Sequence, residues 1–223
     1  MIPLKDRNPT RRIPVVNISL IVLNVALFLY EARLGPALEP FLYRYGMIPR
    51  LVSQEAFNGG IRLGILGTLF SSLFLHGGWL HLIGNMLYLW VFGDNVEDKL
   101  GRSRYLVFYL VCGLSAGAVH VLVDPLSQVP TIGASGAISG VLGAYLLMFP
   151  KARVLTLIPI FIFLQVTELP AYVLLGLWFV LQFFYGMLSL DSQASGLGGV
   201  AWWAHIGGFG AGVLLVFPLR KYR

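Results

Sequence analysis

The chain has 223 residues, of which 57% are hydrophobic and 12% charged, and its mean hydropathy is +0.77. Soluble domains carry about 25% charged residues, so this composition excludes the soluble globular class, and it also excludes disorder. The net charge of +6 could indicate nucleic-acid binding. The hydropathy instead favours membrane orientation as the reason for the basic excess. We therefore expect a membrane protein with several spans and no nucleic-acid partner.

Six stretches are apolar enough to cross a membrane, since a spanning helix needs ~20 mostly apolar residues. They lie at about 14–30, 79–98, 105–123, 135–150, 169–188 and 201–219. This pattern predicts an all-α bundle of six transmembrane helices. We divide the chain into a cytoplasmic N-terminal tail (1–13), a transmembrane domain (14–220) and a cytoplasmic C-terminal end (221–223).

The distribution of Lys and Arg predicts the orientation of these spans. With both termini in the cytoplasm, the basic residues outside the cell are Arg33, Arg44, Arg50 and Arg62, and all others lie on the cytoplasmic side. The positive-inside rule disfavours the opposite orientation. Both termini are therefore predicted to be cytoplasmic.

Two connecting segments are unusually apolar. The first external loop, 31–75, contains apolar runs of its own, and we expect it to lie in the outer leaflet rather than in water. The segment 152–168 is apolar too, but it is short and Pro159 interrupts it. We interpret it as an interfacial or re-entrant piece before the fifth span.

Several polar side chains fall at one depth within the predicted spans. At ~1.5 Å per residue from the nearest cytoplasmic charge, Ser135 lies ~24 Å, His205 ~22 Å, Asn85 ~21 Å and His81 ~27 Å above that charge. Hydrogen-bonding groups at membrane depth are costly and usually functional. These four groups would form a site if their helices touch.

Glycines at spacings of four predict that two of the helices do touch. Gly136 and Gly140 follow Ser135, while Gly208 and Gly212 follow His205. Such ridges let helix backbones approach closely in lipid. Ser135 and His205 would then face each other as a nucleophile and its base. The fourth helix is expected to begin at the serine, with its first N–H groups free to bind an oxyanion.

Other interpretations of the same residues exist. Serine and glycine at helix crossings are most often packing residues, and an intramembrane histidine can simply bond a carbonyl. A haem or metal site would use His81 and His205 as axial ligands but would leave GASGA (133–137) and Asn85 unexplained. A channel or transporter is the third alternative, and many transporter folds show an internal repeat that we do not detect in this sequence.

Four motifs in order along the chain resemble the rhomboid family of intramembrane serine proteases, in its six-span bacterial form. They are FLHGGWLHLIGNM (74–86), FGDNVEDKLG (92–101), GASGA (133–137) and AHIGGFGAG (204–212). The resemblance implies a dyad of Ser135 and His205 without an acidic third member. It also implies an oxyanion hole formed by His81, Asn85 and the Ser135 N–H.

The resemblance assigns supporting roles as well. His76 would have a structural or hydration role beside the site, and Glu97 would stabilise the cytoplasmic end of the second span. Residues 189–200 would form a flexible cap, loop 31–75 would lie on the membrane, and the fifth span would act as a substrate gate.

Two positions depart from the family pattern. Gly67 and Thr68 stand where many members carry a Trp-Arg pair. Ser139 stands one turn after the nucleophile, where an aromatic residue commonly packs under the histidine. We therefore expect other contacts to hold the His205 ring.

The predicted function is hydrolysis of peptide bonds in or near transmembrane segments of membrane proteins, with membrane lipid as the surroundings. We expect no metal or cofactor, because the sequence has neither HExxH nor a P-loop. The main alternative is a catalytically silent relative that binds membrane helices. The compact six-span form suggests the bacterial plasma membrane. The sequence does not indicate the oligomeric state.

Overall fold

The structure is a computed structural model that describes residues 1–60, 62–160, 163–190 and 200–219. The helices are α1 (Val15–Glu31), α2 (Leu38–Tyr45), α3 (Pro49–Phe57), α4 (Leu63–Ser71), α5 (Trp79–Leu100), α6 (Arg102–Val123), α7 (Ser135–Met148), α8 (Ala171–Leu188) and α9 (Trp202–Leu219), with 3₁₀ helices η1 (Gly35–Ala37) and η2 (Ser72–Phe74). The strands are β1 (Ile2–Asp6), β2 (Arg153–Ile160) and β3 (Phe163–Pro170). Most of the predicted cap and the predicted end at 221–223 lie outside the described residues.

The helices supply three to five candidate membrane spans. α6, α8 and α9 are each long and apolar enough to cross a membrane. Two bent pairs qualify if each is counted as one span: α1 with Gly35–Tyr45, bent by 116°, and Leu63–Phe74 with α5, bent by 79°. α7 has only 14 residues and begins at Ser135, as predicted. The protein is thus a mostly helical membrane protein.

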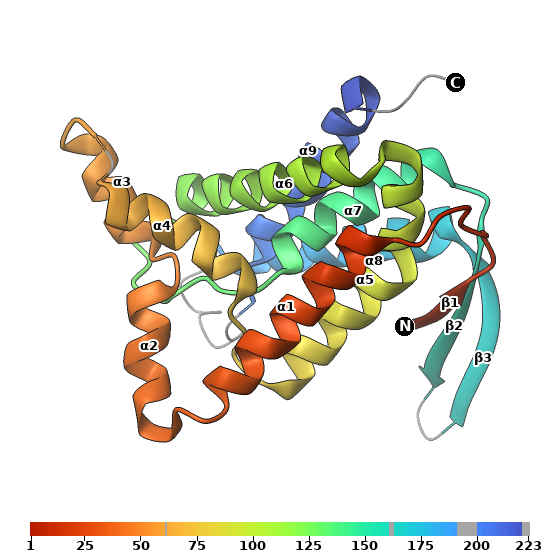
Figure 1. Cartoon of the computed structure of the whole chain (residues 1–223), viewed down its shortest axis with the longest axis horizontal. Helices are drawn as coiled ribbons and strands as arrows, with labels where there is room; N and C mark the ends of the chain where they lie inside the picture. The colour runs from red at the N-terminus through yellow and green to blue at the C-terminus, as the bar shows by residue number, and fades with distance from the viewer. Residues whose placement is uncertain (61, 161–162, 191–199, 220–223) are drawn as a thin grey trace.

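A small sheet corrects the prediction of an all-α fold. β2 pairs antiparallel with β1 on one side and with β3 on the other. The segment 152–168 is therefore largely a β-hairpin (Figure 1) rather than a re-entrant piece. Its Val, Ile, Thr and Phe residues favour strands. Pro159 lies beyond Leu157, the last β2 residue paired with β1, where its missing N–H costs little.

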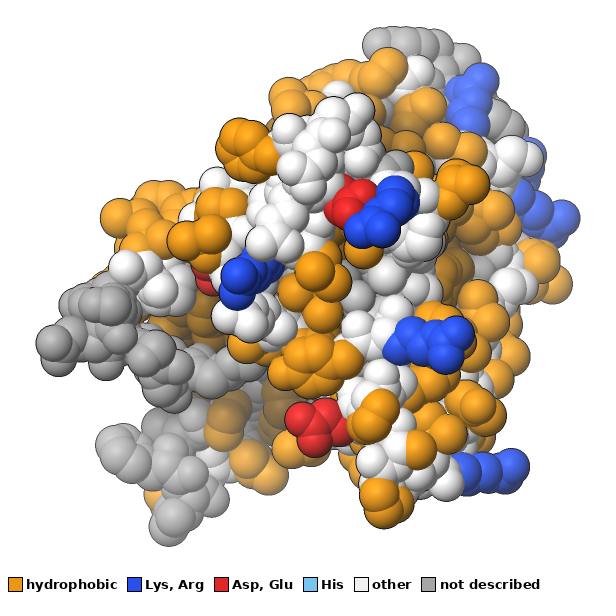
Figure 2. Space-filling view, turned by 90° about the vertical axis from the view of Figure 1, so that its left-hand side faces the viewer, with side chains coloured by type: hydrophobic (Ala, Val, Ile, Leu, Met, Phe, Trp, Pro, Cys, Tyr) orange, Lys and Arg blue, Asp and Glu red, His pale blue; other side chains and the backbone are white. Residues whose placement is uncertain are grey.

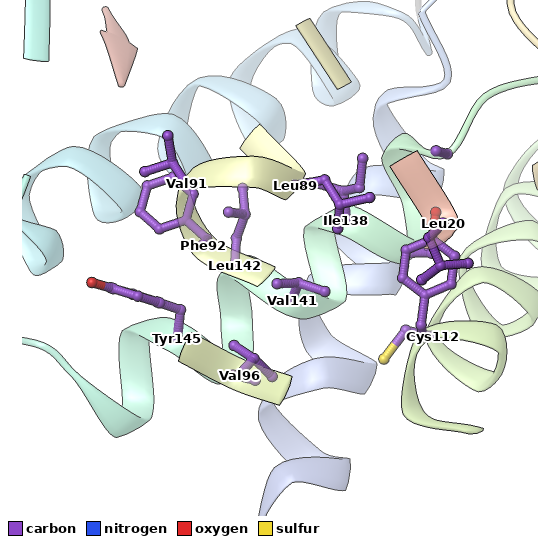
Figure 3. Packing of buried hydrophobic residues seen from close by; sticks show 14 of the residues in the cluster. Leu20, Leu89, Val91, Phe92, Val96, Cys112, Ile138, Val141, Leu142 and Tyr145 are labelled. Atoms are coloured by element: carbon purple, nitrogen blue, oxygen red, sulfur yellow. The ribbon is translucent and has the colours of Figure 1, made fainter. Parts of the chain in front are cut away.

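α7 is the central helix of the bundle. Every residue from Gly136 to Tyr145 is buried. Figure 3 shows α7 side chains, among them Ile138 and Leu142, packing with Leu89 and Phe92 of α5. Because α7 lies in the middle of the hydrophobic core, the position of Ser135 at its first turn is fixed by the packing around it.

The two predicted glycine ridges meet at the contact between α7 and α9. A methyl group on Gly208 would lie 2.0 Å from the carbonyl oxygen of Gly136, and one on Gly212 would lie 2.0 Å from that of Gly140. No real Cβ atom approaches a backbone oxygen so closely. The two backbones are therefore in direct contact, as the spacing of the glycines predicted.

The start of α1 is held by a carboxylate from α5. Pro14 caps α1 without a side-chain hydrogen bond. Glu97, which is 3% exposed, instead accepts hydrogen bonds from the backbone N–H groups of Val16 at 3.2 Å and Asn17 at 2.7 Å. A carboxylate at the positive end of a helix is favourable. This contact joins α1 to α5 and is consistent with the stabilising role expected for Glu97.

The segment between α1 and α5 forms a flank beside the bundle. In Figure 1, α2, α3 and α4 lie to one side of the other helices. Figure 2 shows this flank with many hydrophobic side chains and few charged ones. Phe57 is 91% and Leu63 86% exposed. An exposed apolar surface of this kind fits the predicted position in the outer leaflet, which stays a prediction.

Candidate active site

Ser135 and His205 are in direct contact, although 70 residues separate them along the chain. Ser135 is the first residue of α7, and His205 lies in the first turn of α9. The imidazole Nε2 is 2.8 Å from the serine Oγ. This is a hydrogen-bond distance between a hydroxyl and an imidazole, the relationship that a nucleophile and its base require.

The far side of the His205 ring faces α8. Nδ1 is 2.7 Å from the amide oxygen Oε1 of Gln182. The rings of Trp178 and Trp202 have their centroids 6.0 and 6.2 Å from that of His205. These contacts hold the His205 ring. Such contacts were expected, because Ser139 stands where an aromatic residue commonly packs under the histidine. The Ser139 hydroxyl donates instead to the backbone oxygen of Ser135, at 2.7 Å.

Sequence analysis did not single out Gln182. The available signal was an amide within the apolar run of the fifth predicted span, since polar residues at membrane depth are rare and usually functional. Its contact with His205 depends on how α8 packs against α9. That packing is a tertiary relationship that spacing along the chain does not contain.

His81 places one ring nitrogen next to Ser135. The backbone N–H of Gly77 donates to His81 Nδ1 at 3.4 Å. A neutral imidazole that accepts at one nitrogen carries its proton on the other, so Nε2 is a donor. A methyl group built on Gly133 would lie 2.7 Å from His81 Nε2 and 3.5 Å from Ser135 Oγ. The two atoms thus border the same small space.

Asn85 follows His81 by one turn on the same face of α5. Its side chain is 8% exposed, and within the described part of the chain its amide Nδ2 has no hydrogen-bond partner. A buried amide donor without a partner is unfavourable unless something else occupies its position. Asn85 therefore offers a free N–H group near Ser135.

His76 lies behind His81 rather than beside Ser135. Its side chain is 1% exposed, and its ring centroid is 5.1 Å from that of His81. Its backbone N–H donates to the buried carboxylate of Glu31 at 3.1 Å. Sequence analysis missed Glu31, which ends α1 and reaches the turn before α5. The geometry gives His76 a place in the support of His81.

One cavity of about 890 Å³ contains the site. Ser135, His205, His81 and Asn85 all line it, together with Trp178. The first turn of α7 contains no acidic residue, and the first N–H groups of a helix have no partner within it. The cavity therefore combines a hydroxyl, an imidazole in contact with it, and several N–H groups able to bind a negatively charged oxygen.

The described residues contain no group of three or more His, Cys, Asp or Glu side chains placed to hold a metal ion. His81 and His205 both border the cavity. Each has a ring nitrogen already in a protein hydrogen bond, Nδ1 of His81 with Gly77 and Nε2 of His205 with Ser135. The described residues thus give the metal alternative no specific support.

A comparison with known proteins agrees with the four sequence motifs at 74–86, 92–101, 133–137 and 204–212. Residues 63–222, more than half of the chain, match the rhomboid domain. The chain belongs to the rhomboid family. It is an integral membrane protein, as membership of this family implies.

Its relatives come from several lineages. Rhomboid protein 1 of Saccharomyces cerevisiae mitochondria is 29% identical over 210 residues, which are 91% of this chain and 53% of the relative. RHOMBOID-like protein 5 of Arabidopsis thaliana is 36% identical over 113 residues, 51% of this chain and 34% of the relative. Rhomboid protease GluP of Bacillus subtilis is 39% identical over 89 residues, 40% of this chain and 17% of the relative. The chain thus spans about half the length of these relatives or less.

Proposed function

We propose that this rhomboid-family protein is an intramembrane serine endopeptidase that cleaves peptide bonds in or near transmembrane segments of other membrane proteins. The observation that carries the proposal is the 2.8 Å contact between Ser135 Oγ and His205 Nε2. A serine hydroxyl is a weak nucleophile unless an adjacent base takes its proton. Here the base candidate lies at that distance within a cavity that also offers oxyanion donors.

In the proposed mechanism, His205 Nε2 takes the Ser135 proton as Oγ attacks the scissile carbonyl. The oxygen of the tetrahedral intermediate accepts hydrogen bonds from His81 Nε2–H, Asn85 Nδ2–H and the backbone N–H of Ser135. His205 then protonates the leaving amine. A water molecule, activated by the same imidazole, hydrolyses the acyl-enzyme and regenerates the serine.

The substrate is proposed to be a single-span or other transmembrane protein. In lipid, the backbone of a spanning helix bonds to itself, so its carbonyls are not free to react. A substrate helix must therefore unwind locally before it is cleaved. We expect preferred sites to contain helix-weakening residues, with small side chains next to the scissile bond.

We propose six spans, formed by α1, α5, α6, α7, α8 and α9, with both termini in the cytoplasm. The distribution of Lys and Arg supports this orientation. In this proposed topology, the loop with α2 to α4 lies on the outer face of the membrane and the β2–β3 hairpin lies on the cytoplasmic side. Relatives come from bacteria, plants and mitochondria, and we keep the bacterial plasma membrane as the predicted location.

The test joins labelling of the serine with cleavage of a reporter. Wild type, Ser135→Ala and His205→Ala are reconstituted in membranes with a tagged single-span protein and, separately, treated with a fluorophosphonate. Ser19→Ala is the matched control, because Ser19 is exposed on α1 and its hydroxyl bonds only to Val15 of its own helix. We expect labelling and cleavage in wild type and in the control, and neither in the two site variants.

Each other outcome has a defined meaning. Labelling of wild type without cleavage would show a reactive serine and an unsuitable reporter. A folded wild type that is neither labelled nor active would contradict the proposal. It would favour the alternative of a catalytically silent rhomboid-like protein that binds membrane helices.

A further inference from the structure

The His205 ring makes a hydrogen bond at each nitrogen, and the two bonds have different consequences. Nε2 faces Ser135 Oγ at 2.8 Å, and Nδ1 faces Gln182 Oε1 at 2.7 Å. An amide oxygen can only accept, so the proton of the neutral imidazole lies on Nδ1. Nε2 then has its lone pair directed at the serine hydroxyl. This is the tautomer that a general base for Ser135 needs.

We infer that Gln182 is a positioning residue that holds His205 in its base-competent tautomer and orientation. The inference rests on the proposed function, because the tautomer matters only if His205 acts as a base. Among the described residues, Gln182 is not one of those that line the cavity, and its contact with the site is through His205 Nδ1. It acts through the imidazole, as an orienting third residue does in serine proteases.

The local packing explains why this chain needs such a residue. Ser139, one turn after Ser135, turns its hydroxyl to the backbone of its own helix and offers no ring surface to His205. Trp178 and Gln182 lie one turn apart on α8 and therefore share a face. The Trp178 ring lies beside the His205 ring, and Gln182 places its amide oxygen 2.7 Å from Nδ1, where it can accept a proton from that nitrogen. α8 thus supplies both contacts.

An uncharged acceptor suits this position. Gln182 is 7% exposed, inside a helix apolar enough to span the membrane. A carboxylate there would need desolvation, which is costly in a low-dielectric interior. An amide oxygen can accept the same N–H without that cost. The opposite amide orientation would donate to Nδ1 and leave a proton on Nε2, which would abolish the base. The direction of this single hydrogen bond therefore decides whether the site can work.

The experiment measures the tautomer directly and the kinetics in parallel. Protein labelled with ¹⁵N-histidine is examined by NMR for the protonation of His205 Nδ1 and Nε2, with His205→Asn used to assign the signals. Gln182→Leu removes the acceptor with little change in volume, and Gln182→Glu keeps an acceptor oxygen. Gln165→Leu is the matched control, because Gln165 is exposed on β3.

We expect the wild-type proton on Nδ1. Gln182→Leu should give a mixture of tautomers and lower kcat about 10- to 100-fold, below the ~10⁴-fold loss seen when a triad carboxylate is replaced by an amide. Its KM should stay within about twofold, because Gln182 acts through the base rather than on substrate binding. Gln182→Glu should keep the proton on Nδ1 and a kcat above that of Gln182→Leu. Gln165→Leu should match wild type.

Two results would overturn the inference. One is a wild-type His205 with its proton on Nε2, which is decisive even if Gln182→Leu does not fold. The other is a folded Gln182→Leu protein with wild-type tautomer and kcat. Failure of the proposed function is seen separately, as a wild type whose Ser135 is not labelled by fluorophosphonate. The NMR measurement still tests the role of Gln182 in that case, because it does not depend on turnover.

Discussion

The backbone of Gly212 passes so close to Gly140 that a methyl group on Gly212 would lie 2.0 Å from the Gly140 carbonyl oxygen. Gly140 lies five residues after Ser135 on α7, and Gly212 lies seven residues after His205 on α9. This contact and the similar one between Gly136 and Gly208 determine how closely the two helices approach. The 2.8 Å distance between Ser135 and His205 is therefore a consequence of helix packing below the site.

Replacing Gly212 by alanine should separate α7 from α9. The added methyl group has no room, and overpacking a well-packed interior costs about 1–3 kcal/mol. We expect a lower melting temperature in detergent and slower labelling of Ser135. Gly210→Ala is the control on the same helix, since a Cβ there meets nothing within 4 Å. Equal melting and labelling in both variants would show that this contact does not set the geometry of the site.

Gly133 should tolerate no side chain. Its φ of 124° is rarely adopted by other residues, and a Cβ would lie 2.7 Å from His81 Nε2. We expect Gly133→Ala to displace His81 and to lower kcat about 100-fold or more, the cost of losing one oxyanion donor. Gly35→Ala is the control, because Gly35 also has a positive φ, of 50°, but has nothing within 4 Å. If the two variants cleaved the reporter equally well, the contact between residue 133 and His81 would not limit the activity of the site.

Asn85→Asp tests the free amide donor. The substitution keeps the shape of the side chain but replaces the Nδ2–H group by an oxygen that repels a developing negative charge. We expect kcat to fall about 10²- to 10³-fold with little change in KM, because the lost bond forms only as the oxyanion develops. Asn58→Asp at the exposed end of α3 is the control. A loss confined to KM would place Asn85 in substrate binding instead.

Much of the site could be predicted from the sequence because its residues carry local signals. Counting from the cytoplasmic charges placed Ser135, His205, His81 and Asn85 at one depth, and all four line one cavity. Gln182 and Glu31 gave weaker signals, because each acts through a partner that is distant in the sequence, His205 and His76 respectively. The hairpin was missed for a different reason: the mostly apolar segment 152–168 lacks the alternation of apolar and polar residues that separates a strand from a helix.

The N-terminal strand also has a half-buried carboxyl group that should make stability depend on pH. Asp6 on β1 accepts hydrogen bonds from Tyr145 of α7 at 2.6 Å and from Asn95 of α5 at 3.1 Å. Burial is the largest cause that raises its pKa from 3.8 to about 6, and the nearby Asp94 carboxylate raises it further, against the bond from Tyr145. Between these two values the folded protein holds a proton that the unfolded chain has lost.

Protonation of Asp6 therefore stabilises the fold at low pH, and this contribution is lost as pH rises from about 4 to about 6. The unfolded state binds fewer protons in that range, so the free energy of unfolding should fall with pH. Asp6→Asn removes the titrating group but keeps an acceptor for Tyr145. The difference in melting temperature between wild type and Asp6→Asn should change across this range and be constant above about pH 7. Asp124→Asn, at an exposed residue, is the control. A difference that is independent of pH would show that Asp6 has an ordinary pKa and that the strand is held by its other contacts.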